Sequence, residues 1–300
     1  MKYIRNIFFL ILLLGSLNTF AQTDNLTRAY NSMQKGNADS ARIYIDKAVQ
    51  ESANKKDPQT WYLRGFIYKE EYKKYESNNI RSGLRDTSVN DLFISYRIDS
   101  SHDNKEATFS TLKYLAATYY NDAASNMDSV HFHQAMHAYN KHKMIMKKIS
   151  TSNFNALDVQ FYDALGEIYS GYFFSAPLFE TKRKFLDSAR KAYDAVLAIN
   201  PDDFSANYGL GRLYYNQAVN IITNLPVDAG IPEVNKAQDT CAHLARLSLP
   251  YLDKAHKLEP LKIEPVKGLE GDYYMLHDSE KFQVNKDLEE KIRQQQSPKK

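Results

Sequence analysis

A chain of 300 residues is long enough for one extended domain or two compact ones. Its 43% hydrophobic and 25% charged residues exclude collagen-like, Pro-rich and strongly charged disordered proteins. Only 11 Gly and 9 Pro are present, which favours helices over a sheet with many tight turns. The lone cysteine, Cys241, has no partner for an intramolecular disulfide, and we expect it to be a small buried apolar residue.

Residues 1–21 have the order of a secretory signal peptide. Lys2 and Arg5 make a positive start, residues 7–14 are an unbroken apolar run, and the segment ends on the small Ala21. The run is short against the ~20 apolar residues that a membrane span needs. We therefore expect cleavage after Ala21 and export to the periplasm or cell envelope, although an uncleaved anchor is the alternative. Cleavage removes two positive charges, so the mature chain is nearly neutral and neither nucleic acid nor a membrane is expected as its partner.

Three stretches of the chain share one pattern, in which a largely apolar position is followed by Gly, two further residues and Tyr. The copies are Trp61–Tyr68, Tyr162–Tyr169 and Asn207–Tyr214, and Arg64 breaks the apolar position in the first of them. Other predicted helices carry a small residue and, four positions further along the chain, a large one. These pairs are Ala41 and Ile45, Ala135 and Tyr139, Ala189 and Tyr193, and Ser248 and Leu252. Asp57-Pro58, Asn200-Pro201 and Glu259-Pro260 are expected to close helices.

These residues resemble the tetratricopeptide repeat, whose pattern is W-x2-L-G-x2-Y, then A-x3-F, then P. The resemblance implies an all-α fold, a right-handed superhelical solenoid of antiparallel helix pairs, over residues 22–292 with about six units. Small residues at the Gly and Ala positions would let the two helices of a unit approach closely. No strong linker divides the chain, so one repeat domain is favoured over two domains.

The spacing of the copies predicts where the chain departs from a regular repeat. Gly65 and Gly166 are 101 residues apart, close to three units of about 34 residues. Gly211 follows 45 residues later, and Glu270 takes the equivalent place after another 59. We expect the extra residues as insertions between helices, near residues 170–181 and 219–243. Residues 78–87 are predicted to be a loop, and residues 293–300 a disordered tail.

The sequence contains no convincing motif for a metal site, a phosphate-binding loop or a catalytic nucleophile. His131, His133 and His137 lack further ligands at metal spacing, and Gln134 stands where a metalloprotease helix needs Glu. Gly209-Leu210-Gly211 has no third glycine and follows no strand, so helix packing explains it better than a phosphate loop. No Ser stands in a nucleophile elbow. We therefore expect no enzyme activity, no cofactor and no metal.

The resemblance also implies which residues face a ligand, because the first helix of each unit lines the concave surface in that family. The matching positions are Tyr62, Phe66, Lys69, Asp163, Glu167, Ser170, Tyr208, Arg212, Tyr215, Lys267, Gly271 and Tyr274. Tyr208, Arg212 and Tyr215 are the strongest candidates, since they share one helix face and are side chains typical of interfaces. In each Tyr pair we expect the first residue to pack inside and the second to face the groove. The alternative is that all the tyrosines serve core packing.

The favoured function is a non-catalytic protein-binding scaffold in the envelope of a Gram-negative-type bacterium, which holds a peptide or partner protein in its concave groove. The alternative is a structural or glycan-binding component of an envelope complex. If the groove is not the binding surface, the stretch Val219–His243 is the next place to look. An enzyme hidden in that stretch is disfavoured because no catalytic constellation is visible.

Overall fold

The computed structural model describes residues 24–128, 130–151, 153–175 and 179–296. The predicted signal peptide (residues 1–21) and the last four residues of the predicted tail lie outside these ranges. The described α-helices are α2 (Asn25–Gln34), α3 (Ala38–Ala48), α4 (Pro58–Glu71), α5 (Gly83–Ile98), α6 (Lys105–Ser125), α7 (Phe132–Ile149), α8 (Asn155–Ser175), α9 (Phe179–Ile199), α10 (Phe204–Thr223), α11 (Ile231–Leu258), α12 (Ile263–Met275) and α13 (Ser279–Gln296). Two short turns, η2 (Asn54–Lys56) and η3 (Tyr72–Glu76), flank α4. Within the described ranges the chain has no strand, and none of the helices there is long and apolar enough to cross a membrane.

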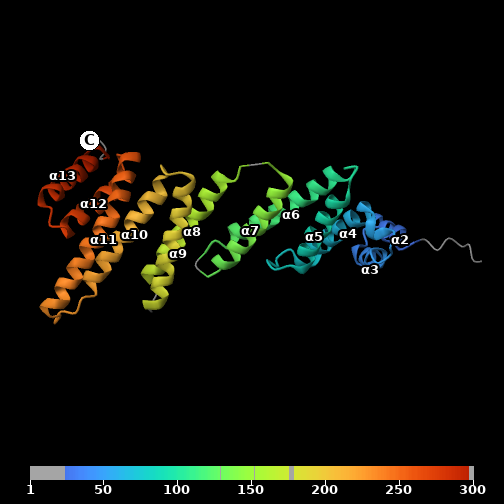
Figure 1. The fold of residues 1–300 in the computed structure, drawn as a ribbon, viewed down its shortest axis with the longest axis horizontal. Helices are drawn as coiled ribbons and strands as arrows, with labels where there is room; N and C mark the ends of the chain where they lie inside the picture. Colours follow the sequence, from blue (N-terminus) through green and yellow to red (C-terminus); the bar gives the residue numbers. More distant parts are fainter. Residues whose placement is uncertain (1–23, 129, 152, 176–178, 297–300) are drawn as a thin grey trace, which may run out of the picture. The chain divides into compact units, whose positions relative to one another are not determined.

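Consecutive helices form antiparallel pairs, α2 with α3 through to α12 with α13 (Figure 1). The pairs group into two compact units. Unit 1 comprises the described residues up to 125 together with 133–151, and so holds α2 to α6 and nearly all of α7. Unit 2 comprises residues 126–132 and the described residues from 153 on, and so holds α8 to α13. The predicted all-α architecture of paired antiparallel helices is confirmed.

Helix starts follow from local capping, as the Pro-containing boundaries predict. Asp57 caps α4 by accepting the backbone N–H of Thr60 (2.8 Å), and Pro58 occupies the first helical position, where no N–H is needed. Asp203 caps α10 in the same way, by accepting the N–H of Ala206 (3.0 Å). Asp57 follows the short turn η2 and Asp203 comes four residues after the end of α9, so each cap marks the start of a new hairpin.

Unit 1 differs from the sequence prediction at residues 78–87, where only the first part is a loop. Helix α5 begins at Gly83, and its N-cap Ser82 accepts the N–H of Arg85 (3.0 Å). Arg85 is fully buried, donates to the Ile80 carbonyl (2.9 Å) and pairs with Asp122 (2.7 Å). The loop prediction was wrong for residues 83–87, since their polar composition concealed an arginine that anchors the helix start in the core.

Arg64, which breaks the apolar position of the repeat, is also explained in unit 1. Its guanidinium pairs with Asp91 on α5 (2.8 Å) and with Asp46 on α3 (2.8 Å), and it lies over the Tyr68 ring (4.6 Å). A charge-assisted network therefore joins three helices where the repeat pattern has a leucine. At this position of the repeat, ion pairs of Arg64 hold the neighbouring helices together in place of apolar packing.

In unit 2 the predicted glycines are the points of closest helix approach. Tyr193 on α9 lies against both Gly166 on α8 and Gly209 on α10, and a Cβ at Gly166 would fall 2.5 Å from the tyrosine ring. Leu252 on α11 lies in the same manner between Gly211 on α10 and Gly268 on α12, at 2.6 and 2.5 Å from where their Cβ atoms would stand. Each large side chain is thus held by a pair of glycines on two successive first helices, an arrangement that we call a glycine socket. The interpretation of these glycines as packing positions is confirmed.

A serine hydrogen bond accompanies the close approach in both units. Ser248 donates to the Gly211 carbonyl (2.9 Å), and Ser88 on α5 donates to the Gly65 carbonyl (2.6 Å) while Leu92 packs on Gly65. Ser88 and Leu92 therefore play the part in α5 that Ser248 and Leu252 play in α11. The sequence comparison missed this small-and-large pair.

The predicted spacing of three short units between Gly65 and Gly166 was wrong. This stretch contains two hairpins, and the intermediate copy lies on α6, where the buried Ala116 replaces Gly and Tyr119 follows three residues later. The four helices α4 to α7 have 14 to 21 residues each, so added helical turns lengthen the repeat.

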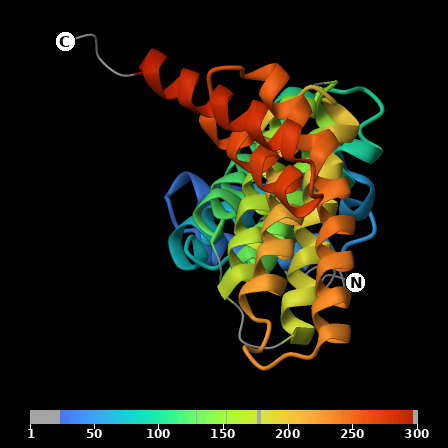
Figure 2. The ribbon, with the colours of Figure 1, turned by 90° about the vertical axis from the view of Figure 1, so that its left-hand side faces the viewer.

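Lengthened helices also replace the predicted insertions. Residues 170–175 are the end of α8, and residues 179–181 begin α9. Most of 219–243 belongs to α10 and to the 28-residue α11, which leaves only a short loop between them. Figure 2 shows the far end of this α10–α11 hairpin (orange) extending beyond α12 and α13 (red). Helix α13 continues to Gln296, so the prediction of a disordered tail was wrong for residues 293–296.

Candidate functional site

Two adjoining pockets in unit 2 bring together the predicted ligand-facing residues of α10 and α12. The first, of about 300 Å³, is lined by Tyr208, Arg212, Tyr215, Asn216, Leu252, Glu264, Lys267 and Gly268. The second, of about 430 Å³, is lined by Tyr215, Val219, Ile222, Thr223, Lys267, Glu270, Gly271, Tyr274, Met275 and Phe282. Because Tyr215 and Lys267 line both, the two pockets form one surface, which we call the groove. All six residues predicted for these two helices lie in it.

Arg212 is held in place at the α8 side of the groove. Its guanidinium donates to the Glu167 carboxylate (2.6 Å) and lies over the Tyr208 ring (5.4 Å). Glu167, one of the predicted residues, also accepts a hydrogen bond from the Tyr193 hydroxyl (2.8 Å). It therefore links the groove to the glycine socket of Tyr193. Arg212 is therefore held by Glu167 while 30% of its side chain stays exposed, which is the state expected of a preorganised contact.

Tyr215 serves both packing and the groove. Its ring lies directly against Gly271 on α12, where no Cβ could fit, and it also lines both pockets. Tyr274 is the opposite case, with 70% of its surface exposed. The prediction for Tyr pairs holds for Tyr119, which is buried, and for Tyr274, but Tyr214 and Tyr215 are both half-buried.

The α8 positions show one error of the sequence prediction. Ser170 is buried, with its hydroxyl 3.4 Å from that of Tyr193, and it does not face a ligand. Asp163 is half-buried, and burial together with the charges of Asp203 and Glu167 raises the pKa of Asp163 to about 6. Ser170 follows the repeat spacing, but α8 packs closely on α9 there, and the pattern alone gives no sign of that contact.

In unit 1, Tyr62 and Phe66 lie together as predicted. Their rings are 6.2 Å apart, and with Tyr30 and Met33 of α2 they line a shallow pocket of about 270 Å³. Lys69 extends over the Phe66 ring (3.9 Å) and pairs with Glu70 (2.6 Å). This apolar surface is a second, smaller candidate site within its own unit.

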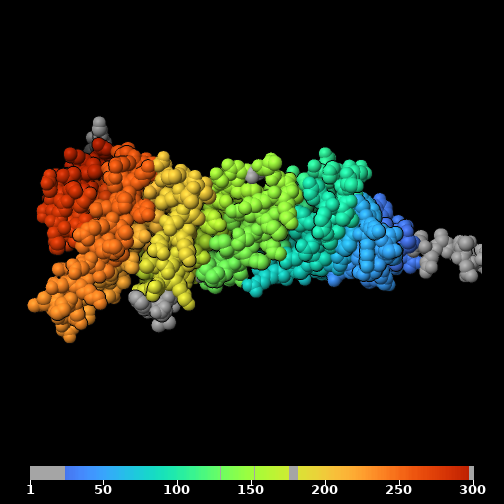
Figure 3. Space-filling view, viewed as in Figure 1, coloured from blue at the N-terminus to red at the C-terminus, as the bar shows by residue number. Residues whose placement is uncertain are grey.

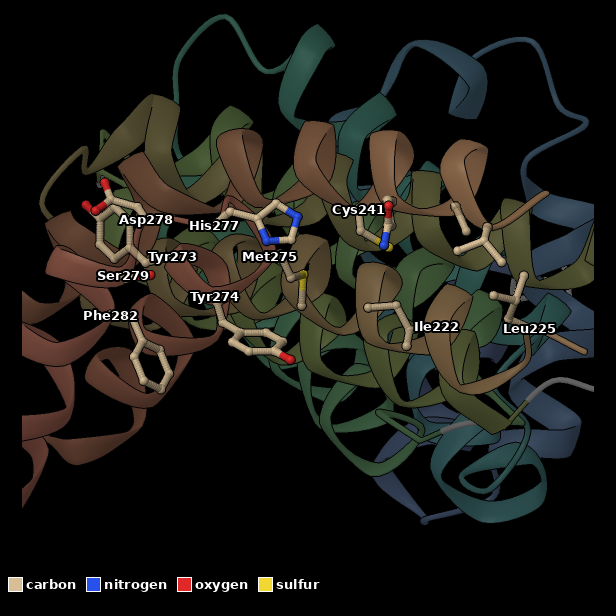
Figure 4. A pocket seen from close by; sticks show the side chains of 13 residues that line it. Ile222, Leu225, Cys241, Tyr273, Tyr274, Met275, His277, Asp278, Ser279 and Phe282 are labelled. Atoms are coloured by element: carbon tan, nitrogen blue, oxygen red, sulfur yellow. The ribbon is translucent and has the colours of Figure 1, made fainter. Parts of the chain in front are cut away.

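A third pocket in unit 2 is larger than either pocket of the groove, and part of its lining comes from the stretch Val219–His243, which the sequence analysis named as the next place to look. It has a volume of about 530 Å³ and lies between the end of the α10–α11 hairpin and the α12–α13 turn (Figure 4). We call it the tip pocket; it is lined by Ile222, Leu225, Val234, Ala237, Gln238, Cys241, Tyr273, Tyr274, Met275, His277, Asp278, Ser279 and Phe282. In Figure 3 the corresponding recess lies between the projecting orange tip and the red helices. The extra length of residues 219–243 was the only sign of it in the sequence.

Metal-ligating groups are dispersed in the part of the chain that the structure describes, where no cluster of three or more His, Cys, Asp or Glu could hold a metal ion. His131 pairs with Asp128 (2.9 Å), and His133 and His137 are exposed. Cys241 is buried, as predicted, and its thiol donates to the Ala218 carbonyl (3.4 Å).

Fold and groove together define a helical-repeat protein, in which a surface along successive first helices presents aromatic and charged side chains. No family model and no curated protein matches the chain. Solved structures that match the chain include the following three. A TPR repeats protein from Bacteroides fragilis is 12% identical with a TM-score of 0.46, covering 84% of this chain and 97% of its own.

The other two structures are more distant. A monomeric mutant of IFIT1 with Gppp-AAAA is 11% identical with a TM-score of 0.32, over 87% of this chain and 48% of that one. The assembly chaperone of RpL4, Acl4, is 11% identical with a TM-score of 0.24, over 85% of this chain and 96% of that one. At such identities and scores, none of these proteins' binding properties transfers to this chain.

Proposed function

We propose that this protein is a non-catalytic scaffold whose unit 2 binds an extended peptide segment of a partner protein in the groove. One observation carries the proposal: six side-chain positions at repeat spacing on α10 and α12 line a continuous surface. Tyr and Arg are the residue types that most often anchor interfaces. Arg212 is fixed by Glu167, so less conformational entropy is lost when a ligand binds beside it.

The composition of the groove favours a peptide over a phosphate polymer. Lys267 and Arg212 stand near the acidic Glu264 and Glu270, so the surface has no excess of one sign. A nucleic-acid site needs clustered positive charge, whereas a peptide with mixed side chains is matched by mixed charges and aromatic rings.

The test is selection of random peptides by phage display on purified residues 22–300, followed by measurement of Kd for the enriched peptides. Replacing Tyr208 and Lys267 together with alanine should weaken binding by about tenfold or more, since interface anchors contribute 1–2 kcal/mol or more each. The matched control is Val284→Ala with Lys291→Ala, two exposed α13 positions outside the pockets. If no peptide is enriched, or the groove and control variants bind equally, the proposal fails, and retention on peptidoglycan instead would favour the glycan-binding alternative.

We further propose that the protein acts in the envelope after export. The support is the sequence of residues 1–21, with its basic start and apolar run. Expressed in a Gram-negative host, the periplasmic protein should begin at Gln22 by N-terminal sequencing. A Lys2→Glu/Arg5→Glu variant should accumulate as precursor. A membrane-bound product that keeps Met1 would contradict cleavage.

A further inference from the structure

We infer that the tip pocket is a subsite of the groove that takes one bulky, uncharged apolar side chain of the bound peptide. The inference rests on the proposed function and adds a specificity rule to it, namely which residue the peptide must carry beside its polar part.

Continuity of the two surfaces is the first argument. Ile222, Tyr274, Met275 and Phe282 line both the groove and the tip pocket. Ile222 is 49% exposed and Tyr274 is 70% exposed, so both offer apolar surface to a ligand. A peptide that lies along α10 and α12 therefore touches the mouth of the tip pocket, and a side chain at that point can enter it.

The walls of the pocket decide what kind of side chain fits. Apolar groups come from three directions: Leu225 follows α10, Val234 stands on α11, and Met275 ends α12. Figure 4 shows Leu225 and Met275 among the lining side chains. Ala237, also on α11, leaves open space where a larger residue would fill the pocket. A volume of about 530 Å³ with such a lining is typical of sites for apolar ligand groups.

Asp278, the acidic residue that lines the tip pocket, does not make the pocket a site for a cation. Asp278 accepts the backbone N–H of Lys281 (3.1 Å) and pairs with the Lys281 ammonium (3.4 Å), so its charge is used at the start of α13. A charged side chain entering the pocket would lose its hydration, and the one carboxylate among the lining residues is already paired with Lys281. An uncharged residue such as Leu, Met, Phe or Trp suits the pocket.

The experiment uses the peptides selected on the full mature chain. They should share one apolar residue at a fixed position, and changing that residue to alanine should weaken binding about tenfold or more. Ala237→Trp, and as a second filling variant Val234→Trp, should bind the parent peptide more weakly and lose the penalty for the alanine change, because the two alterations remove the same contact. Asp239→Trp, an exposed position on the same helix, should behave as wild type.

A thiol at an accessible position in the tip pocket reports on occupancy. Cys241, the chain's single cysteine, lines the pocket but is buried and donates to the Ala218 carbonyl, so it reacts too slowly to serve as the reporter. Gln238 lines the same pocket and is exposed, so in a Gln238→Cys/Cys241→Ala variant the parent peptide should slow the reaction with N-ethylmaleimide, and the alanine-substituted peptide at equal saturation should not. Peptides without a fixed apolar residue, an unchanged alanine penalty in both filled variants, or no protection of the introduced thiol would each overturn the subsite while leaving peptide binding intact. If no peptide is enriched on the wild type, the groove proposal fails and this inference fails with it.

Discussion

Replacing Gly211 with leucine should destabilise unit 2 by about 1–3 kcal/mol, the usual cost of overpacking a close contact. A Cβ at this position would lie 2.6 Å from Leu252 Cγ and 3.1 Å from the backbone nitrogen of the same residue. Leu252 cannot retreat, since Gly268 is against its other side. The helices must separate instead, which also strains the bond from Ser248 to the Gly211 carbonyl.

Gly171 offers a matched control in the same unit. It lies in α8 with no heavy atom within 4 Å of an added Cβ, so Gly171→Leu should be neutral or stabilising by up to about 1 kcal/mol through helix propensity alone. Thermal unfolding by circular dichroism, with hydrogen exchange of α10 and α11 to locate the effect, compares the two variants. Equal melting of Gly211→Leu and wild type would show that α10 and α11 do not touch at this point.

The second large effect is expected at Asp272, where substitution by asparagine should stabilise the protein above neutral pH. Asp272 on α12 is fully buried, and within the described residues neither carboxyl oxygen has a hydrogen-bond partner. Burial, only partly offset by the nearby Ser248 hydroxyl, raises the pKa of Asp272 to about 8. The carboxyl group is therefore held uncharged in the folded protein at neutral pH.

The pH dependence of stability follows from whether Asp272 binds a proton in the folded and in the unfolded chain. Below about pH 4 the carboxyl binds a proton in the folded and in the unfolded chain, so it adds no pH dependence. Between about pH 4 and 8 the unfolded chain releases that proton and the folded chain keeps it, so stability falls as pH rises. The loss is complete above about pH 8, where Asp272→Asn avoids it.

The gain from Asp272→Asn should therefore grow by about 2–4 kcal/mol between pH 5 and pH 8, which is the order of magnitude of a raised pKa across that range. Unfolding in urea at the two pH values, with hydrogen exchange over α12 as the local readout, measures it. Asp239→Asn is the control, because solvent surrounds that exposed carboxyl before and after unfolding. A gain that does not change with pH would mean that Asp272 is ionised in the fold.

The sequence predicted the helical pairs well because their packing rests on few residue types. Gly166, Gly209 and Gly211 each lie against a large side chain of a neighbouring helix, with which an added Cβ would collide. The groove positions on α10 and α12 followed from the same spacing. Glu270 was correctly aligned with Gly211, since Gly268 and Gly209 stand two residues earlier and fulfil the same role.

What the sequence concealed were contacts that no spacing rule encodes. Ala116 takes the place of a repeat glycine, so the intermediate copy on α6 was passed over and the number of units between Gly65 and Gly166 was overestimated. Arg64 and Arg85 are polar residues that work as core packing, through carboxylates distant in the chain. The tip pocket depends on how far α10 and α11 extend past α12, and residue identities alone do not fix that length.

The glycine sockets bear on how such a chain gains or loses repeats. Because Tyr193 is held by Gly166 of its own hairpin and Gly209 of the next, a hairpin cut out at its loops carries one complete helix pair and an unfinished socket. The smallest piece that contains a complete socket is then three helices, α8 to α10, in which both glycines are present. Duplication or deletion of a repeat would preserve every socket only if both breakpoints fell at equivalent places in the repeat, so that one whole helix pair is gained or lost.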